Sequence, residues 1–226
     1  ETAAILIEPV LGEGGYVVPP RRFLQELRKL CNEHGILLIV DEIQSGFGRT
    51  GRWFAYEYFD ILPDIMTVAK GLGSGLPISG VVSKLDLMAK WIPGSHGGTF
   101  GGNAVAAAGA VATIQAIHED NLLENAIARG NQLKNGLLDL QKRYPMIGDV
   151  RGLGLMLGVE FRDNQRNPDK VAAKAVVHAC LKKKLLLITC GPWDNTIRFI
   201  PPLIVDQNQI DAGLNIFEDS LKEILS

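Results

Sequence analysis

The feature that most constrains the fold is the apolar run "GILLIVDE", residues 35–42, which ends in two adjacent carboxylates. Its apolar residues are continuous and do not alternate, which is typical of a parallel strand covered on both faces. Similar short runs, "AILIEP", "IMTVAKG" and "SGVVSK", recur along the first half of the chain, and residues 20–34 between the first two have helical periodicity. The pattern predicts an α/β fold with a mainly parallel central sheet and helices on both faces.

The second half of the chain has a different pattern. It begins with an Ala-rich helical stretch, residues 103–143, which polar residues interrupt at 118–121. The alternating run "LGLMLGVEF" then predicts one strand, "LLLIT" and "TIRFIPP" predict two more, and the last helix is expected to be capped by Asp206. We therefore expect residues 1–117 to be the C-terminal portion of a large domain and residues 118–226 to be a smaller α+β domain.

The charge balance and the hydropathy exclude two classes of partner. The 226 residues include 23 basic and 25 acidic side chains, and no basic run is long enough to follow a phosphate backbone. The longest apolar stretch, residues 104–117, is shorter than the roughly 20 residues that cross a bilayer. We therefore expect neither nucleic acid nor a membrane as a partner.

The three cysteines, Cys31, Cys180 and Cys190, lie in apolar surroundings without CxxC spacing. An odd number of such residues indicates buried reduced thiols, and hence a reducing compartment such as the cytoplasm. The four histidines lack metal-ligand spacing, so no metal site is expected. The chain opens at Glu1 without a methionine, and we expect it to be part of a longer protein whose targeting segment, if it has one, precedes this residue.

Charged residues end three of the predicted strands. Glu8 closes the first, Asp41 the second and Lys70 the third, and the fourth leads after an interval to "GGTFGGN". Ligands of parallel α/β sheets bind beyond the carboxyl ends of the strands, so we expect these side chains to converge on one crevice. The alternative for each is a capped turn or a solvated surface charge.

The glycines after Lys70 do not form a nucleotide-binding loop. A phosphate loop requires GxxxxGK[ST], with the lysine after the glycines, and a dinucleotide site requires GxGxxG at the start of a helix. Asp41 and Lys70 together match another chemistry. A pyridoxal phosphate enzyme needs a lysine that binds the aldehyde and a carboxylate that keeps the pyridine nitrogen protonated.

Four motifs, "IVDEIQSGFGRTG", "PDIMTVAKGLGSGLPISG", "GGTFGGN" and "TIRFIPPL", resemble those of the class III pyridoxal phosphate-dependent aminotransferases in order and spacing. Within the class, "EPVLGEGG", "RKLCNEHGI" and "LLLITCG" look most like 4-aminobutyrate aminotransferase. The resemblance implies a fold-type I transferase, with residues 1–117 as part of its large pyridoxal phosphate-binding domain. It also implies that the phosphate-binding turn, the ring-stacking aromatic residue and the arginine for the ω-carboxylate lie upstream of this chain.

The resemblance also assigns roles to the residues at the cofactor. Lys70 would bind the cofactor and move the proton between substrate and cofactor, and Asp41 would pair with the pyridine nitrogen. Ile43, expected on the same strand face as Asp41, would pack against the ring, and Gln44 would reach its phenolic oxygen. Thr99 would bind the phosphate in the neighbouring subunit, which implies a homodimer with a shared active site.

For the substrate, the resemblance implies that Arg198 binds the α-carboxylate of glutamate or 2-oxoglutarate, and that Glu8 pairs with Arg198 when that carboxylate is absent. The expected reaction is transamination of an ω-amino acid, with 4-aminobutyrate as the first candidate, to 2-oxoglutarate, giving the semialdehyde and glutamate. Alternative donors are acetylornithine, ornithine or another ω-amino acid. A further alternative is a non-catalytic fragment that dimerises without turnover.

Overall fold

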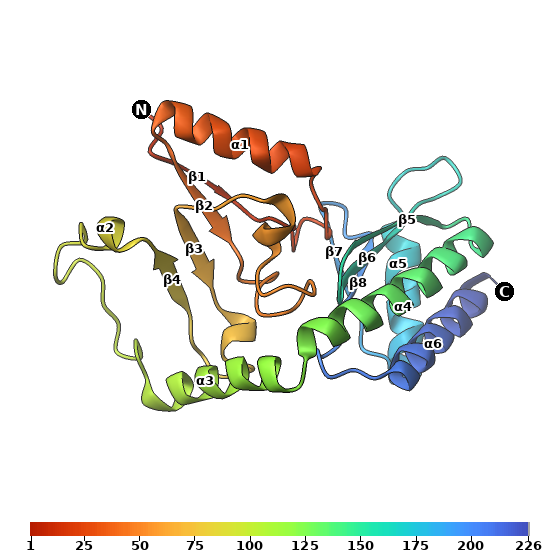
Figure 1. Cartoon of the computed structure of the whole chain (residues 1–226). Coiled ribbons are helices and arrows are strands. Elements are labelled where there is room, and N and C mark those ends of the chain that lie inside the picture. Colours follow the sequence, from red (N-terminus) through yellow and green to blue (C-terminus); the bar gives the residue numbers. More distant parts are fainter. Residues whose placement is uncertain (226) are drawn as a thin grey trace. The chain divides into compact units, whose positions relative to one another are not determined.

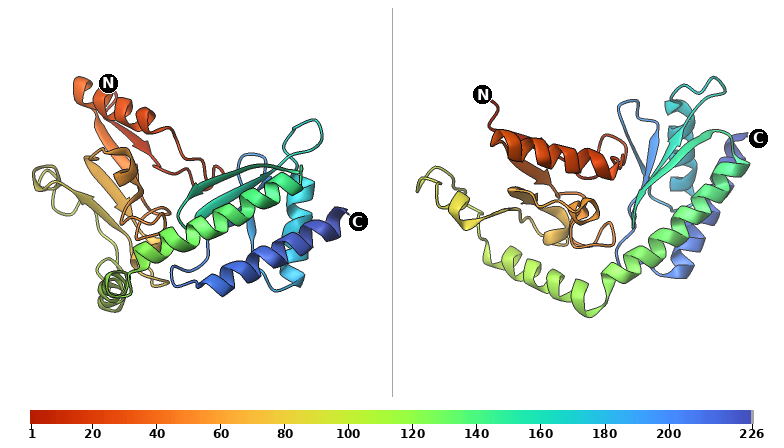
Figure 2. Two further views of the ribbon diagram at one scale, coloured as in Figure 1. Left: turned by 45° about the vertical axis from the view of Figure 1, so that its right-hand side comes forward. Right: turned by 45° about the horizontal axis from the view of Figure 1, so that its top comes forward.

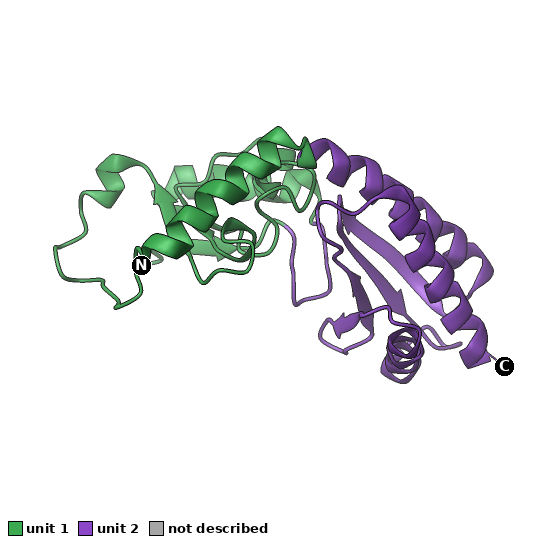
Figure 3. Cartoon of the chain, turned by 90° about the horizontal axis from the view of Figure 1, so that it is seen from below, with its two compact units in different colours: residues 1–9, 19–122 green, residues 10–18, 123–226 purple. Residues whose placement is uncertain are grey.

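The computed structural model describes residues 1–225, and this part of the chain forms two compact units. Unit 1 comprises Glu1–Pro9 and Pro19–Leu122, and unit 2 comprises Val10–Val18 and Leu123–Ser226 (Figure 3). The short segment Val10–Val18 thus belongs with the second half of the chain, although it follows the first strand directly. The sequence-based division at residue 117 stays a prediction about the domains of the whole protein.

Unit 1 is built on a four-stranded sheet in the order β1-β2-β3-β4 (Figure 1). Three strands, β1 (Ala4–Ile7), β2 (Leu37–Asp41) and β3 (Ile65–Val68), are parallel. The predicted α/β fold with a mainly parallel sheet is therefore confirmed. Because these strands are parallel, their carboxyl ends lie at the same edge of the sheet.

The fourth strand, β4 (Gly80–Ser83), runs antiparallel to β3, so its carboxyl end lies at the opposite edge. This strand is the exception to the mainly parallel sheet that the sequence predicts. The reason is the connection: β3 and β4 are joined by a short segment containing only the 3-10 turn η2 (Lys70–Leu72), whereas a parallel return requires a longer crossover.

Helix α1 (Arg21–His34) covers one side of this sheet, and α3 (Ala104–Glu119) lies on the other side in both views of Figure 2. The buried face of α1 includes Leu24 and Cys31, as the helical periodicity predicted. Asn103 caps α3 by accepting the backbone N–H groups of Val105 and Ala106, each at 3.1 Å. The remaining elements of unit 1 are short, η1 (Ala55–Phe59) and α2 (Leu85–Met88).

Unit 2 is an antiparallel sheet with three helices. The strands are in the order β5-β6-β8-β7, and the unit fits the smaller α+β architecture that the sequence predicts. Its elements are α4 (Leu122–Arg143), β5 (Ile147–Leu153), β6 (Met156–Phe161), α5 (Lys170–Lys182), β7 (Ile188–Cys190), β8 (Thr196–Phe199) and α6 (Gln207–Leu225). The cap predicted for the last helix is present, since Asp206 accepts the N–H of Gln209 at 2.8 Å.

The strand predicted over "LGLMLGVEF" is confirmed for Met156–Phe161, which form β6, but not for the first three residues of the run. The chain turns at Gly154 and Leu155, and Leu153, the last residue of β5, pairs with Met156, the first residue of β6, at the end of the β5–β6 hairpin. Gly154 has a φ of 53°, a left-handed conformation that suits a tight turn. The alternation of apolar residues continues across the turn and so concealed it.

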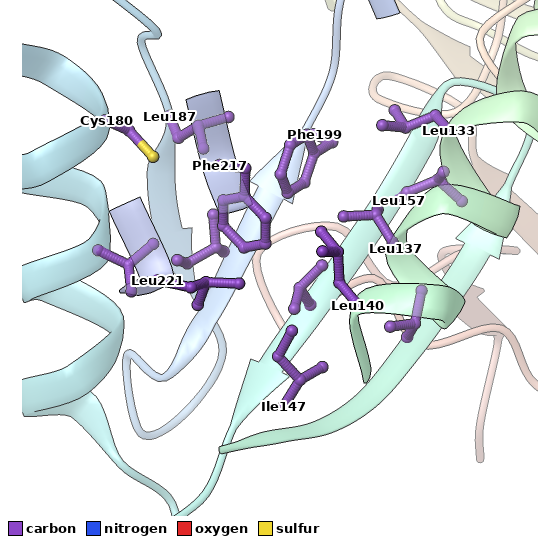
Figure 4. Close-up of a cluster of buried hydrophobic side chains, with 14 of the residues drawn as sticks. Leu133, Leu137, Leu140, Ile147, Leu157, Cys180, Leu187, Phe199, Phe217 and Leu221 are labelled. Carbon is purple, nitrogen blue, oxygen red and sulfur yellow. The ribbon is translucent and has the colours of Figure 1, made fainter. Parts of the chain in front are cut away.

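The core of unit 2 is one cluster of apolar side chains from α4, α5, α6 and three strands (Figure 4). At its centre the ring of Phe217 meets those of Phe161 and Phe199 edge to face, with centroids 6.5 and 5.0 Å away. The three cysteines are buried free thiols, as predicted, and Cys180 lies in this cluster. No helix within residues 1–225 is both long and apolar enough to traverse a membrane.

Candidate active site

The shared edge of β1, β2 and β3 holds three of the residues singled out in the sequence. Glu8 follows β1, Asp41 is the last residue of β2, and Lys70 follows β3 by two residues. Asp41 is in register with Thr67 of β3, three residues before Lys70. The parallel strands therefore bring a carboxylate and an amine to neighbouring strand ends.

Asp41 ends its strand by forming a turn. Its Oδ1 atom accepts the backbone N–H of Ile43 at 2.9 Å, a local bond by which aspartate side chains commonly redirect the chain. Ile43 therefore lies beyond the strand, and the alternation that was expected to place it on the same face as Asp41 does not apply. The roles of Ile43 and Gln44 at a bound ring remain predictions, and both side chains are half-buried.

Lys70 has an unusual backbone for a residue with a side chain. Its φ angle is 42°, in the left-handed region, at the first position of η2. This conformation costs a non-glycine residue about 1–3 kcal/mol, and it persists only where neighbouring structure enforces it. The side chain is exposed, so the amine is free to meet a ligand at the edge. A strained, exposed lysine that follows a strand end next to Asp41 is a candidate functional residue.

Thr99 lies in the connection between α2 and α3. Its side chain is exposed, and the chain around it forms turns. The antiparallel direction of β4 means that this connection does not start at the edge that carries Asp41 and Lys70. The expectation that Thr99 serves a neighbouring subunit stays a prediction.

Arg198 belongs to unit 2, where it lies on β8. Its Nη1 atom donates to Oε1 of Glu13 at 2.5 Å, and only 11% of the side chain is exposed. Its Nε atom is buried and has no hydrogen-bond partner. An arginine with a buried, unsatisfied N–H beside an exposed carboxylate is suited to receive a second, incoming carboxylate.

The partner of Arg198 in the structure is thus Glu13, whereas the resemblance suggested Glu8. Glu8 and Arg198 are in different units, so the predicted pairing of these two residues stays a prediction. Glu13 was missed although a signal was present: in "GEGG" a charged residue stands between glycines, five residues after Glu8.

The segment that carries Glu13 is fixed to unit 2 by two hydrogen bonds to its backbone carbonyls. The N–H of Gly191 donates to the carbonyl of Glu13 at 2.8 Å, and Nε of Arg151 donates to the carbonyl of Gly15 at 2.7 Å. Arg151 also pairs with Asp149 and Glu160. The backbone of Glu13 is therefore fixed, whereas its side chain is 70% exposed.

The residues of unit 1 fit the cofactor that the resemblance implies. Pyridoxal phosphate requires an accessible amine for its aldehyde and a carboxylate for its ring nitrogen. Lys70 is exposed at the edge of the sheet, and Asp41 ends the adjacent parallel strand. Among the described residues, this pair supplies the donor set that the cofactor needs.

Comparison with known proteins agrees with this chemistry. The family model described as Aminotransferase class-III matches residues 1–221. The 5-aminovalerate aminotransferase of Pseudomonas putida is 44% identical over 225 residues, and the 4-aminobutyrate aminotransferase of Escherichia coli is 43% identical over 225 residues. Each alignment covers 99% of this chain and 53% of the relative, so the chain spans about half the length of these relatives.

The solved structures agree with the fold. The crystal structure of a transaminase from the marine bacterium Virgibacillus superposes with a TM-score of 0.92 at 34% sequence identity. The match covers 98% of this chain and 53% of the transaminase chain.

Proposed function

This chain belongs to the class-III aminotransferases, a family that depends on pyridoxal phosphate, and we propose on that premise that the whole protein transfers the amino group of an ω-amino acid to 2-oxoglutarate. The products are the semialdehyde and glutamate. The observation that carries the proposal is the strained, exposed Lys70 at the sheet edge to which the adjacent strand delivers Asp41.

Each of these two side chains has one task in the reaction. When bound, pyridoxal phosphate supplies a sink for the electron pair left as the substrate carbon loses a proton. Nζ of Lys70 would take that proton from the substrate carbon and deliver it to the cofactor, and the second half-reaction would reverse this transfer. The carboxylate of Asp41 keeps a proton on the ring nitrogen, which makes the sink effective. Ile43 would pack against the ring, and Gln44 would reach its phenolic oxygen.

Arg198 distinguishes the two kinds of substrate. Glutamate and 2-oxoglutarate have an α-carboxylate, which takes the guanidinium, whereas 4-aminobutyrate has no such group and leaves the arginine to a glutamate side chain. Glu13 is the first candidate for that side chain because it pairs with Arg198 in the structure, and Glu8 is the second. An arginine satisfied in both states avoids a buried unpaired charge.

The amino donor is the finer part of the proposal. We favour 4-aminobutyrate, and 5-aminovalerate, one carbon longer, is supported by a relative of similar identity. Relatives named acetylornithine aminotransferases also match this chain, and acetylornithine and ornithine are the alternatives. We further propose a cytoplasmic homodimer in which Thr99 reaches the phosphate bound by the partner subunit.

The decisive experiment maps the lysine that carries the cofactor. The complete protein is loaded with pyridoxal phosphate, reduced with borohydride and digested, and the modified peptide is identified by mass spectrometry. We expect the pyridoxyl group on Lys70. Modification of Lys84 or Lys90 would refute the assignment of the site, and cofactor binding on Lys70 without turnover would favour the non-catalytic alternative.

A further inference from the structure

Glu42, the residue after Asp41, is a completely buried carboxyl group. Its Oε2 atom accepts the hydroxyl of Ser45 at 2.6 Å, and Oε1 accepts the backbone N–H of Tyr56 at 2.8 Å. Burial raises the pKa of Glu42 above its ordinary value. Burial of a carboxyl group is costly unless its oxygens accept hydrogen bonds, so the bonds from Ser45 and Tyr56 offset the cost of burying Glu42.

The two bonds of Glu42 close a loop. Ser45 stands at its beginning and Tyr56 at its end, so a single carboxyl group ties residues 45 and 56 to the end of β2. The backbone reinforces the closure, since the N–H of Gly46 donates to the carbonyl of Glu42 at 3.0 Å. A Cβ atom at Gly46 would lie 2.8 Å from that carbonyl oxygen, so only glycine fits here.

The same loop supports the turn that contains Lys70. A Cβ atom added at Gly71 would lie 3.1 Å from Cβ of Phe47 and 3.7 Å from the carbonyl oxygen of Gly46. Phe47 is buried and has a φ of 54°, so the loop itself is held in a left-handed conformation where it meets the turn. The backbone next to Lys70 thus packs directly on a loop whose closure depends on Glu42.

From these contacts we infer that Glu42 is a positioning residue of the cofactor site. Its buried carboxyl group holds the loop from Ser45 to Tyr56 closed and keeps Phe47 against Gly71. Through that contact it maintains the strained backbone of Lys70, and it also fixes the turn that follows Asp41. The predicted effect of Glu42 on cofactor binding rests on the proposed function. The closure of the loop by Glu42 does not, because it depends only on contacts within unit 1.

The test compares Glu42→Gln with Asp64→Asn in the complete protein. Asp64 is a matched control because its carboxylate also accepts a backbone N–H, that of Leu38 at 2.8 Å, and pairs with Arg28 at the opposite edge of the same sheet. Both variants are expected to lower the unfolding temperature. Ser45→Ala removes one of the two side-chain bonds to Glu42 and serves as a milder variant if Glu42→Gln does not fold.

The first measurement is amide hydrogen exchange of the cofactor-free protein. The N–H groups of Leu72 and Gly73 bond to the carbonyls of Ala69 and Lys70 at 3.0 and 3.2 Å and report on the turn. We expect their exchange to accelerate at least about tenfold in Glu42→Gln, or in Ser45→Ala to a smaller degree, and to remain unchanged in Asp64→Asn. Equal exchange in all variants would overturn the inference, whatever the protein catalyses.

The second measurement is the affinity for pyridoxal phosphate, by fluorescence titration, together with kcat. A misplacement of about 1 Å at a reacting group lowers a rate by up to about 100-fold, so we expect Glu42→Gln to lose affinity and kcat beyond what Asp64→Asn loses. If the wild-type protein bound no cofactor, the proposed function would be wrong. The hydrogen-exchange result would still test whether Glu42 holds the loop closed. A loss in Glu42→Gln no greater than in Asp64→Asn would show that Glu42 is only structural.

Discussion

The two sheets differ in how far the chain itself buries them. In unit 2 every residue of β6 except Glu160 is buried, and the strand lies within the apolar cluster around Phe217. In unit 1 no residue of β4 is buried, and Leu6 of β1 is 63% exposed. The residues proposed for the chemistry of the cofactor lie mainly at the edge of the less covered sheet.

This difference separates two kinds of contribution. A closed core contributes free energy of folding in proportion to the apolar area it buries, whereas an open edge with a strained residue contributes reactivity at a cost in stability. Substitutions in unit 2 should therefore act mainly on the free energy of unfolding. Substitutions at the carboxyl edge of unit 1 should act mainly on cofactor binding and turnover.

The largest expected effect is that of Lys70→Ala. The variant should lose at least about 10⁴-fold in the rate of the first half-reaction, because both the covalent attachment and the proton transfer are removed. The free energy of unfolding should change by less than about 0.5 kcal/mol, because the side chain is exposed. Single-turnover kinetics and thermal unfolding of the complete protein measure the two effects. Lys84→Ala, also exposed, is the control, and a similar rate loss in it would break the comparison.

The reverse pattern is expected for Phe217→Ala. Removing this buried ring from its contacts with Phe161 and Phe199 should lower the free energy of unfolding by about 3–5 kcal/mol. The remaining folded protein should keep its rate per bound cofactor. Phe23→Ala, on the exposed side of α1, should cost less than about 1 kcal/mol. Urea titration measures the free energy of unfolding of both variants. Equal costs for the two substitutions would mean that the core of unit 2 stabilises the protein no more than the exposed side of α1 does.

Arg198→Lys tests the one residue of unit 2 proposed to act on substrate. The half-reaction with glutamate should weaken by about 1.5–3 kcal/mol, because lysine keeps the charge and loses the planar fork. The half-reaction with 4-aminobutyrate should change much less. Equal losses would make Arg198 structural.

Glu13→Gln and Glu8→Gln, compared in the same assay, identify the partner of Arg198. The residue that pairs with the arginine is the one whose substitution changes the ratio of the two half-reactions. Because Glu13 is paired with it in the structure, we expect the larger change for Glu13→Gln.

The smallest effect concerns the ion pairs between α4 and α6. The Arg143 guanidinium, with Tyr144 and Lys222, lowers the pKa of Glu218 from 4.5 to about 2. A carboxylate with a lowered pKa stabilises the fold above pH 4.5, and this contribution is lost as the pH falls toward 2. Glu218→Gln should therefore cost less than about 1 kcal/mol at pH 7, and the cost should shrink at pH 3. Urea unfolding at both pH values checks it, with Asp219→Asn as the exposed control.

The sequence predicted the parts of this molecule that depend on local periodicity and failed where direction mattered. The strand that ends in Asp41 and helix α1 were found because continuous and helical apolar patterns are local properties. The antiparallel direction of β4 was missed because apolarity carries no information on strand direction. The break at Gly154 was hidden by alternation that continued on both sides of it.

At the candidate site, the sequence identified Lys70 and Asp41 from their chemistry, but it did not identify what supports them. The contact between Phe47 and Gly71 joins residues 24 positions apart, and no motif predicts it. The pairing of Glu13 with Arg198 spans 185 positions and depends on the segment Val10–Val18 belonging to unit 2. Such long-range pairings follow from tertiary packing, which single-sequence patterns do not encode.

The path of Val10–Val18 limits where segments of this chain can be exchanged with those of a relative. Because unit 2 consists of this segment and residues 123–226, the backbone passes from one unit to the other at three places, next to Pro9, Pro19 and Leu122. A chimaera made with a single crossover near residue 122 would combine Arg198 and Arg151 of one parent with Glu13 and Gly15 of the other. Recombination that keeps the pairing of Arg198 with Glu13 from one parent must therefore transfer two separate stretches of the gene together.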